Sequence, residues 1–235
     1  MIRDQDDTRQ LDYIYWIKAN PSRIKLIQKD LCFSVPDFNG QVKTFKFYHH
    51  DVARQLFGVP RFFGIYHFGT PEVNTLTEAT IEKLTFNGRL REYQEDAVSK
   101  TVAQLKNIGG ATIHASCGAG KTTMSLAIVS ELKQRTLIVV HKLILAKQWE
   151  ERISQFLPCK SVILQGKESR LDDEVDIVIT TIQSLSSASC KWDLSKFGMM
   201  VCDESHHYAA SHWAGLFFKM KPKFVLGLSA TPKRR

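Results

Sequence analysis

Eight consecutive residues near the middle of the chain have the types and spacing that bind a polyphosphate. They run from Ala115 to Thr122 and read Ala-Ser-Cys-Gly-Ala-Gly-Lys-Thr. Gly118 and Gly120 lack a Cβ, so backbone N–H groups can approach an anion closely, and the helix that follows presents its positive N-terminal end. Lys121 would reach the β- and γ-phosphates, and the Thr122 hydroxyl would coordinate Mg²⁺. The strict pattern begins with Gly, whereas this stretch begins with Ala115, so the stretch alone is also compatible with a glycine turn before a helix.

A pair of acidic residues further along supplies the second half of such a site. Asp203 and Glu204 directly follow the apolar run from Met199 to Cys202, which predicts a buried strand. Phosphoryl transfer to water needs an acid that holds the metal and a base that orients the attacking water. Asp203 would bind Mg²⁺ and Glu204 would polarise the water. Two solvated acids capping a helix would give the same pair, but a phosphate loop about 80 residues upstream favours the catalytic interpretation.

The elements that must position these residues alternate along the chain. From about Leu90 onward, short apolar runs alternate with amphipathic stretches, which predicts a parallel sheet covered by helices. The expected helices are residues 91–107, 121–133 and 143–156, and the expected strands are residues 111–114, 136–140, 161–164, 175–180, 198–202 and 224–228. The first 85 or so residues are aromatic-rich and interrupted by Gly and Pro, which indicates a separate small α+β module. We therefore expect an accessory module over residues 1–87 and an α/β domain over residues 88–235.

Within that module the segments 11–17 and 24–31 fit either helix or strand.

The composition is that of an ordinary globular protein, with 43% apolar and 24% charged residues. The 32 basic and 24 acidic residues give a net charge of +8, and residues 91–235 carry most of the excess, which favours a polyanionic partner. Five scattered cysteines without a Cys-x-x-Cys pair argue against a disulfide framework and a zinc site. With a polar, acidic N-terminus and no apolar run of ~18 residues, we expect a soluble intracellular protein in a reducing compartment and no membrane partner.

Two further segments complete a recognisable pattern. Leu90-Arg91-Glu92-Tyr93-Gln94 precedes the phosphate loop, and Ser229-Ala230-Thr231 follows the last expected strand. With the acidic motif Asp203-Glu204-Ser205-His206, they closely resemble the first RecA-like lobe of superfamily 2 helicases and translocases, of the DEAD/DEAH-like and ResIII type. The resemblance covers residues 88–235, and in this family the phosphate loop commonly begins with Ala, as it does at Ala115. It implies a RecA-like parallel sheet with helices on both faces, and an ATP-dependent nucleic-acid helicase or translocase that uses ATP and Mg²⁺.

The resemblance also implies a role for each motif residue. Gln94 would hydrogen-bond the adenine edge, and His206 would link the nucleotide site to Ser229 and Thr231, which couple it to a moving element. The implied catalytic residues are Lys121, Asp203, Glu204 and His206, and the implied Mg²⁺ ligands are Thr122 and Asp203. The implied nucleotide-binding residues are Arg91, Gln94, Gly118, Ala119, Gly120, Lys121, Thr122 and Thr123. The cluster His206, His207 and His212 could also suggest a metal site, but no further ligand follows at suitable spacing, and we favour the non-metal interpretation.

Two segments are similar to those with which the family grips nucleic-acid phosphates. They contain His141 and Lys142, and Thr180 and Thr181. Hydroxyls, helix N-termini and a Lys suit backbone contacts, which carry affinity without sequence information. We favour DNA over RNA as the partner. Trp149 lies at helical spacing from its apolar neighbours and is expected in the core.

The accessory module offers one more resemblance. Residues 59–69, Val-Pro-Arg-Phe-Phe-Gly-Ile-Tyr-His-Phe-Gly, resemble a stretch that precedes the core in helicases of large DNA viruses, including relatives of the poxvirus transcript-release helicase. An aromatic-rich loop that docks the module is the alternative interpretation. Lys43, Lys46, Arg54 and Arg61 are interleaved with aromatic residues and are further candidates for nucleic-acid contact.

The family resemblance also implies a second lobe, and two other functions fit part of the same pattern. In the family a second RecA-like lobe supplies an arginine finger, so we expect that lobe in a longer form or a partner chain and weak ATP hydrolysis by this chain alone. A non-catalytic nucleic-acid-binding or scaffold protein could retain the same lobe, although it would not need Lys121, Thr122, Asp203 and Glu204 together. A small-molecule P-loop kinase fits worse, because it does not explain Ser229-Ala230-Thr231.

Overall fold

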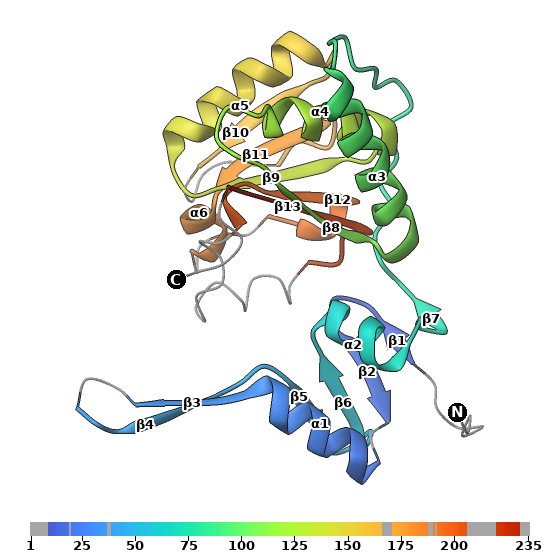
Figure 1. Ribbon diagram of the computed structural model, residues 1–235, viewed down its shortest axis with the longest axis vertical. Coiled ribbons are helices and arrows are strands. Elements are labelled where there is room, and N and C mark those ends of the chain that lie inside the picture. Colours follow the sequence, from blue (N-terminus) through green and yellow to red (C-terminus); the bar gives the residue numbers. More distant parts are fainter. Residues whose placement is uncertain are drawn as a thin grey trace. The chain divides into compact units, whose positions relative to one another are not determined.

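The chain forms two compact units, residues Met1–Thr75 and Leu76–Arg235 (Figure 1). The computed structural model describes residues 9–18, 20–36, 39–165, 171–187, 190, 192–205 and 220–230. The sequence places the division near residue 88, but residues 76–87 belong to the second unit. Thr77 and Thr80 form single β-bridges with Pro222 and Gln134, and the Leu84 side chain is 2% exposed in the core of that unit.

The second unit is built on a six-stranded sheet in which every strand pair is parallel. The strand order is β10-β11-β9-β12-β13-β8. The bounds are β8 Gly110–His114, β9 Thr136–Val140, β10 Ser161–Leu164, β11 Ile177–Thr181, β12 Met199–Cys202 and β13 Phe224–Ser229. The helices are α3 Glu92–Ile108, α4 Lys121–Leu132, α5 Leu143–Phe156 and α6 Ile182–Ser186, with a 3₁₀ turn, η1, at Leu194–Lys196. The expected parallel sheet with covering helices is confirmed.

Apolar residues cover both faces of this sheet and explain its strand sequences. One core cluster joins the sheet to α3, α4 and α5, and a second joins the opposite face to α6 and the segment around Phe197 (Figure 1). The central strand β9 reads Thr-Leu-Ile-Val-Val, and all its residues are buried. A continuous apolar run of this kind is typical of a parallel strand buried on both faces. α3 ends where Gly109 adopts a left-handed conformation (φ 77°) and its N–H donates to the Leu105 carbonyl.

The first unit contains a five-stranded sheet in the order β5-β6-β2-β1-β7 and a separate two-stranded ribbon, β3-β4. The bounds are β1 Gln10–Leu11, β2 Tyr15–Lys18, β3 Cys32–Pro36, β4 Val42–Lys46, β5 His49–Asp51, β6 Leu56–Val59 and β7 Val73–Asn74, with helices α1 Pro21–Leu31 and α2 Arg61–Phe68. Residues 11–17 are therefore strand and turn, and residues 24–31 are helix. The Asn20 side chain caps α1 by accepting from the Arg23 N–H, and Pro21 fits the first helical position.

Residues 61–68 form a helix rather than the aromatic loop considered from the sequence. Gly64, in the middle of α2, explains the interruption of its aromatic run. A Cβ at Gly64 would lie 2.2 Å from Cγ of Tyr15, so the helix backbone rests directly on the Tyr15 ring. The Tyr15 hydroxyl donates to the Gly69 carbonyl at 3.0 Å and fixes that ring. In the described part of the chain, no helix is long and apolar enough to cross a membrane.

We predict that Gly64→Ala destabilises the first unit. The added methyl group overpacks the contact with Tyr15, at a cost of about 1–3 kcal/mol, which outweighs the gain of up to about 1 kcal/mol from the better helix former. Hydrogen exchange over residues 56–69, followed with urea unfolding, measures the change. In a Tyr15→Ala background the same substitution should cost less. Equal costs in both backgrounds would contradict this packing.

Candidate nucleotide-binding site

Most of the predicted site residues that the structure describes lie at the carboxyl edge of the parallel sheet. The phosphate loop follows β8, Asp203 follows β12, and His141 follows β9. Thr181 and Ser229 are the last residues of β11 and β13. Parallel strands end at a common edge, which is where open α/β sheets bind their ligands. The sheet thus gathers segments that are more than 100 residues apart in sequence, such as Ala115 and Ser229.

The phosphate loop has the backbone conformation that its glycines allow. Gly118 (φ 81°) and Gly120 (φ 84°) are both left-handed, and Gly120 is the N-cap of α4. Lys121 is the first residue of that helix, and its ammonium donates to the carbonyl oxygens of Ala115 at 2.9 Å and Ser116 at 3.2 Å. Thr122 and Thr123 lie half-buried in the first turn. The loop therefore curls around the lysine side chain at the positive end of a 12-residue helix.

The Gln94 side chain braces the phosphate loop from α3. Its amide nitrogen donates to the Ala119 carbonyl at 3.0 Å, and its amide oxygen accepts from the Arg91 N–H at 2.9 Å. A Cβ at Gly120 would lie 2.4 Å from that amide nitrogen. Gln94 is only 7% exposed, and both hydrogen bonds of its side-chain amide are made to the backbone of this chain. The adenine contact stays a prediction for Gln94, and so does base contact for Arg91, which is exposed.

Tyr93 belongs to this site although the sequence analysis gave it no role. Its hydroxyl donates to the Ala119 carbonyl at 3.1 Å, and the ring is 50% exposed. The Arg91 guanidinium lies 3.4 Å from the same hydroxyl. An exposed aromatic residue next to Gln94 was the available signal.

The Asp203 carboxylate is held at both oxygens. Oδ1 accepts from the Glu204 N–H at 3.0 Å, and Oδ2 accepts from the indole N–H of Trp149 at 2.8 Å. Burial raises the pKa of Asp203 and the Glu204 charge adds to this, whereas the Trp149 hydrogen bond and the Lys121 charge oppose it. Glu204 itself has a left-handed backbone (φ 51°), which is uncommon for a non-glycine residue. Strain of this kind is often stored at functional sites.

The third motif is attached to the strand that feeds the phosphate loop. The Ala115 N–H donates to the Ser229 carbonyl at 3.2 Å, and Nε2 of His114 lies 3.0 Å from the Ala230 carbonyl. Ser205 packs against β13, because a Cβ at Gly227 would lie 3.3 Å from the Ser205 hydroxyl oxygen. These contacts connect all three motifs. His114 was not among the predicted residues, and only strand pairing reveals its position.

Several predicted residues lie outside the described part of the chain. They are His206, His207, His212 and Thr231. The coupling roles of His206 and Thr231 therefore stay predictions. Among the described residues, no group of three or more His, Cys, Asp or Glu side chains could hold a metal ion.

The two predicted nucleic-acid segments lie side by side. Thr181 pairs with Val140 in the ladder between β11 and β9, and the Gln183 amide nitrogen donates to the His141 carbonyl at 3.3 Å. Lys142 is exposed and is the N-cap residue of α5. Thr181 is partly exposed and caps α6 by accepting from the Ser184 N–H.

Thr180 does not belong to this surface, so the prediction that it contacts nucleic acid is wrong. The side chain is 0% exposed, and the hydroxyl donates to the Leu164 carbonyl at 2.9 Å. Alternation along β11 turns Thr180 into the sheet interior while Thr181 ends the strand.

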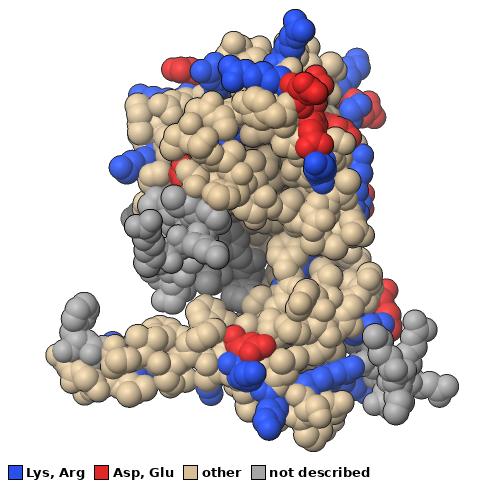
Figure 2. Space-filling model, viewed as in Figure 1, with Lys and Arg blue, Asp and Glu red and all other residues tan. Residues whose placement is uncertain are grey.

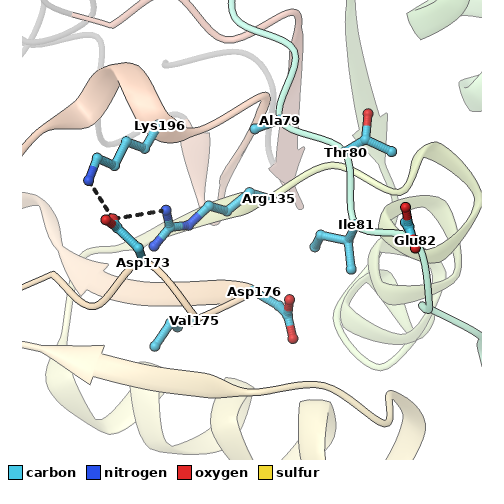
Figure 3. Close-up of a pocket in the computed structure, with 9 residues that line it drawn as sticks. All are labelled: Ala79, Thr80, Ile81, Glu82, Arg135, Asp173, Val175, Asp176 and Lys196. Carbon is cyan, nitrogen blue, oxygen red and sulfur yellow. Dashed lines mark hydrogen bonds and ion pairs between the residues drawn. The ribbon is translucent and has the colours of Figure 1, made fainter.

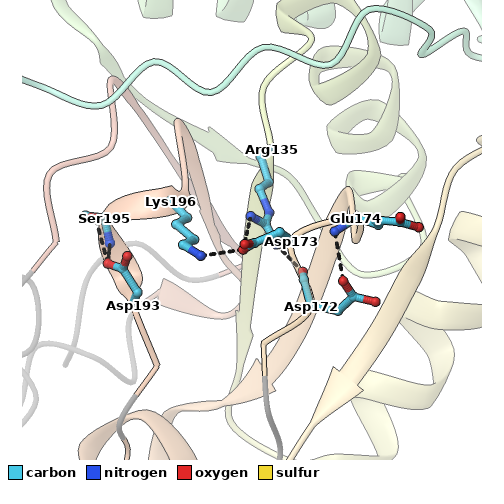
Figure 4. Close-up of polar contacts among 7 residues, drawn as sticks. All are labelled: Arg135, Asp172, Asp173, Glu174, Asp193, Ser195 and Lys196. Atoms are coloured by element: carbon cyan, nitrogen blue, oxygen red, sulfur yellow. Dashed lines mark hydrogen bonds and ion pairs between the residues drawn. The ribbon is translucent and has the colours of Figure 1, made fainter.

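The amino edge of the sheet holds a different recess, with a volume of about 500 Å³ (Figure 3). Arg135 and Lys196 pair there with Asp173, and the Arg135 guanidinium also donates to the Asp172 carbonyl (Figure 4). Arg135 stacks on Phe197 with 5.4 Å between the guanidinium carbon and the ring centre. These three charged side chains thus pair with one another and connect the loops before β9, β11 and β12. On the face seen in Figure 2, basic and acidic side chains of the second unit are interspersed rather than gathered in one patch.

A family comparison identifies the chain. Residues 87–234 match the family described as "Type III restriction enzyme, res subunit" (ResIII). The chain therefore belongs to this family of superfamily 2 helicases, as the motif resemblance implied.

Related proteins include helicases of large DNA viruses. A "Putative ATP-dependent RNA helicase" of Acanthamoeba polyphaga mimivirus is 32% identical over 74% of this chain and 34% of its own length. A "Putative helicase" of Invertebrate iridescent virus 3 is 30% identical over 94% and 73%. The "DNA 3'-5' translocase XPB2" of Sulfurisphaera tokodaii is 36% identical over 62% and 31%. The chain thus spans about a third of the mimivirus and archaeal relatives. The relation to the poxvirus transcript-release helicase stays a prediction.

Solved structures share the fold. The UvsW helicase from bacteriophage T4 matches with a TM-score of 0.63 at 18% identity, over 97% of this chain and 93% of that chain. The Sulfolobus solfataricus SWI2/SNF2 ATPase core in complex with dsDNA matches with a TM-score of 0.53 at 24% identity, over 67% and 34%. The RecA-like character of the sheet is thereby confirmed.

We predict that Asp203→Asn stabilises the chain at neutral pH when Mg²⁺ and nucleotide are absent. Because the folded state raises the pKa of Asp203, ionising this group in the native state costs stability as pH rises through and above its usual range. Asn removes the buried charge and can still accept the indole hydrogen bond. Thermal unfolding in EDTA should show a gain at pH 7 that shrinks toward pH 4. A loss of stability at pH 7 would contradict the electrostatic assignment.

Proposed function

We propose that this chain is the ATP-binding motor lobe, with an accessory module, of an ATP-dependent nucleic-acid helicase or translocase. The observation that carries the proposal is the convergence of Lys121, Asp203 and Ser229 at one edge of a parallel sheet, where the Ala115 N–H bonds the Ser229 carbonyl and the Lys121 charge acts on Asp203. A phosphate loop alone would suit many nucleotide-binding proteins. The acidic pair and the attached third motif suit one that couples hydrolysis to movement.

The side chains have separate tasks in this proposal. The N–H groups of residues 118–123 and the Lys121 ammonium bind and neutralise the phosphates, after the ammonium gives up its bonds to the Ala115 and Ser116 carbonyls. Glu204 orients water and accepts its proton. Gln94 and Tyr93 hold the Ala119 carbonyl and so keep the loop in its binding shape.

The residues present also fit Mg²⁺. The Thr122 hydroxyl and the Asp203 carboxylate are hard oxygen donors, which this ion prefers. Burial raises the pKa of Asp203, and the Lys121 charge opposes this rise, so the ammonium lies near enough to interact with the carboxylate. Held by Thr122 and Asp203, Mg²⁺ would help to neutralise the charge of the phosphates.

Nucleic acid is proposed to bind through His141, Lys142 and Thr181. The exposed Lys142 at the start of α5 and the half-buried Thr181 at the start of α6 lie on neighbouring strand ends. Helix N-termini and a Lys suit phosphates and give no sequence information. DNA is favoured over RNA because one relative is named a DNA translocase and one structural neighbour was solved with dsDNA, although other relatives are named RNA helicases.

A second RecA-like lobe, in a longer form or a partner chain, is part of the proposal. An arginine finger typically contributes about 10³ to 10⁵ in rate, so steady-state ATPase of this chain alone should be slow. Brisk turnover stimulated by nucleic acid would contradict the need for that lobe. A non-catalytic scaffold is the second candidate, and it would bind nucleic acid without any nucleotide requirement.

Substitution of Lys121 tests the nucleotide site. We predict that Lys121→Ala weakens ATP binding by about 10- to 100-fold, because it removes charge-assisted hydrogen bonds to phosphate. Titration with a fluorescent ATP analogue measures this. Lys106→Ala is the control, because Lys106 lies in the last turn of α3 and pairs only with the surface Glu131 among the contacts described. Equal ATP affinity of both variants and the parent would refute the phosphate-loop assignment.

Substitution of Lys142 tests the nucleic-acid surface. We predict that Lys142→Ala weakens binding about equally for different sequences and lowers the slope of log K against log salt by about 1. Single- and double-stranded DNA and RNA are compared by fluorescence anisotropy from 50 to 200 mM salt. Lys106→Ala again serves as the control of equal charge. An unchanged salt slope would exclude Lys142 from the phosphate contacts.

A further inference from the structure

A buried tryptophan outside the predicted site residues contacts the acidic motif. Trp149 lies in α5, is 2% exposed, and packs in the core cluster beneath the sheet face that α3, α4 and α5 cover. Its helical spacing predicts a core residue, which is confirmed. Packing alone needs no N–H group at this position, yet the indole N–H donates to Oδ2 of Asp203 at 2.8 Å.

The indole bond determines how the carboxylate is oriented. Oδ1 of Asp203 accepts from the Glu204 N–H, and the Asp203 N–H donates to the Val139 carbonyl, so the backbone of this residue is fixed by β9. The side-chain torsions are then set by two hydrogen bonds, one from the Glu204 N–H to Oδ1 and one from the indole to Oδ2. Each carboxylate oxygen has two lone pairs, so both oxygens keep one for another partner. The indole thus aligns the carboxylate and leaves a lone pair on each of its oxygens for another partner.

The helix that carries Trp149 is well suited to this task. α5 begins directly after β9, the strand that pairs with β12, and Ala146, Trp149 and Ile153 form its buried face. Two turns of rigid helix, about 10 Å, separate Trp149 from Lys142 at its N-terminus. The indole is therefore held in the core and cannot follow a misplaced carboxylate.

We propose that Trp149 is a positioning residue that orients the Asp203 carboxylate for Mg²⁺. The proposal rests on the proposed function and deepens it. Groups that hydrogen-bond a metal-ligating carboxylate fix its geometry, and their removal typically costs about 10- to 100-fold in metal affinity. Trp149 touches neither phosphate nor metal, and it acts through Asp203.

The test replaces the indole N–H while keeping an aromatic ring. In Trp149→Phe, we expect the Mg²⁺ concentration that half-saturates Mg²⁺-dependent binding of a fluorescent ATP analogue to rise by about 10-fold or more. Nucleotide binding measured in EDTA, and DNA binding without nucleotide, should stay at the level of the parent chain. A packing defect alone would weaken Mg²⁺-dependent nucleotide binding, nucleotide binding in EDTA and DNA binding together.

Trp192→Phe is the matched control, because Trp192 packs against the core cluster on the opposite face of the same sheet. Thermal unfolding of both variants reports their loss of packing. An unchanged Mg²⁺ requirement in Trp149→Phe, or an equal rise in Trp192→Phe, overturns the inference and leaves the proposed function standing. Failure of the parent chain to bind the analogue at any Mg²⁺ concentration overturns the proposed function, and this inference with it.

Discussion

The constraint on which this molecule depends is that all six strands of the larger sheet run in one direction with both faces covered. Because neighbouring strands run in the same direction, the chain has to return to the amino edge of the sheet through a crossover after each strand. Every strand therefore delivers its following loop to the same edge. The phosphate loop, Asp203, His141 and Thr181 come together for this reason.

The site at this edge is costly to the fold. Asp203 sits where burial raises its pKa, and Glu204 adopts a backbone conformation that a non-glycine residue rarely adopts. The neighbouring structure compensates with oriented hydrogen bonds from the Trp149 indole and the Glu204 N–H. The phosphate loop is likewise shaped by Gln94, Tyr93 and its own lysine before any anion binds. Under the proposed function such preorganisation would serve phosphoryl transfer, because that chemistry consists mainly of positioning and charge stabilisation.

At the opposite edge of the sheet, charged residues pair with one another. Arg135, Lys196 and Asp173 face a recess of considerable volume, but their charges are directed at one another. Ion pairs whose acidic partner is exposed, as Asp173 is, contribute little stability individually. Together they fix the loops that enter β9, β11 and β12, and so support the strands whose far ends carry the site.

The sequence by itself determined the class of fold and most of the motif residues. Hydrophobic runs and breakers are local signals, and so β9 and α5 were located at residues 136–140 and 143–156, as observed. The phosphate loop, the acidic pair and Gln94 were found because their chemistry requires fixed residue types at short spacing. The sequence also placed Trp149 in the core, since burial follows from helical period.

Only the tertiary structure decided which side chains meet. Thr180 looked equivalent to Thr181, but the pleat of β11 buries one hydroxyl against Leu164 and leaves the other at the strand end. Trp149 and Asp203 are 54 residues apart, and their hydrogen bond exists because β9 and β12 are neighbours in the sheet. Strand order is a property of long-range pairing, and no local pattern encodes it. For the same reason residues 76–87 fold with the second unit: their bridges to Gln134 and Pro222 join segments far apart in the chain.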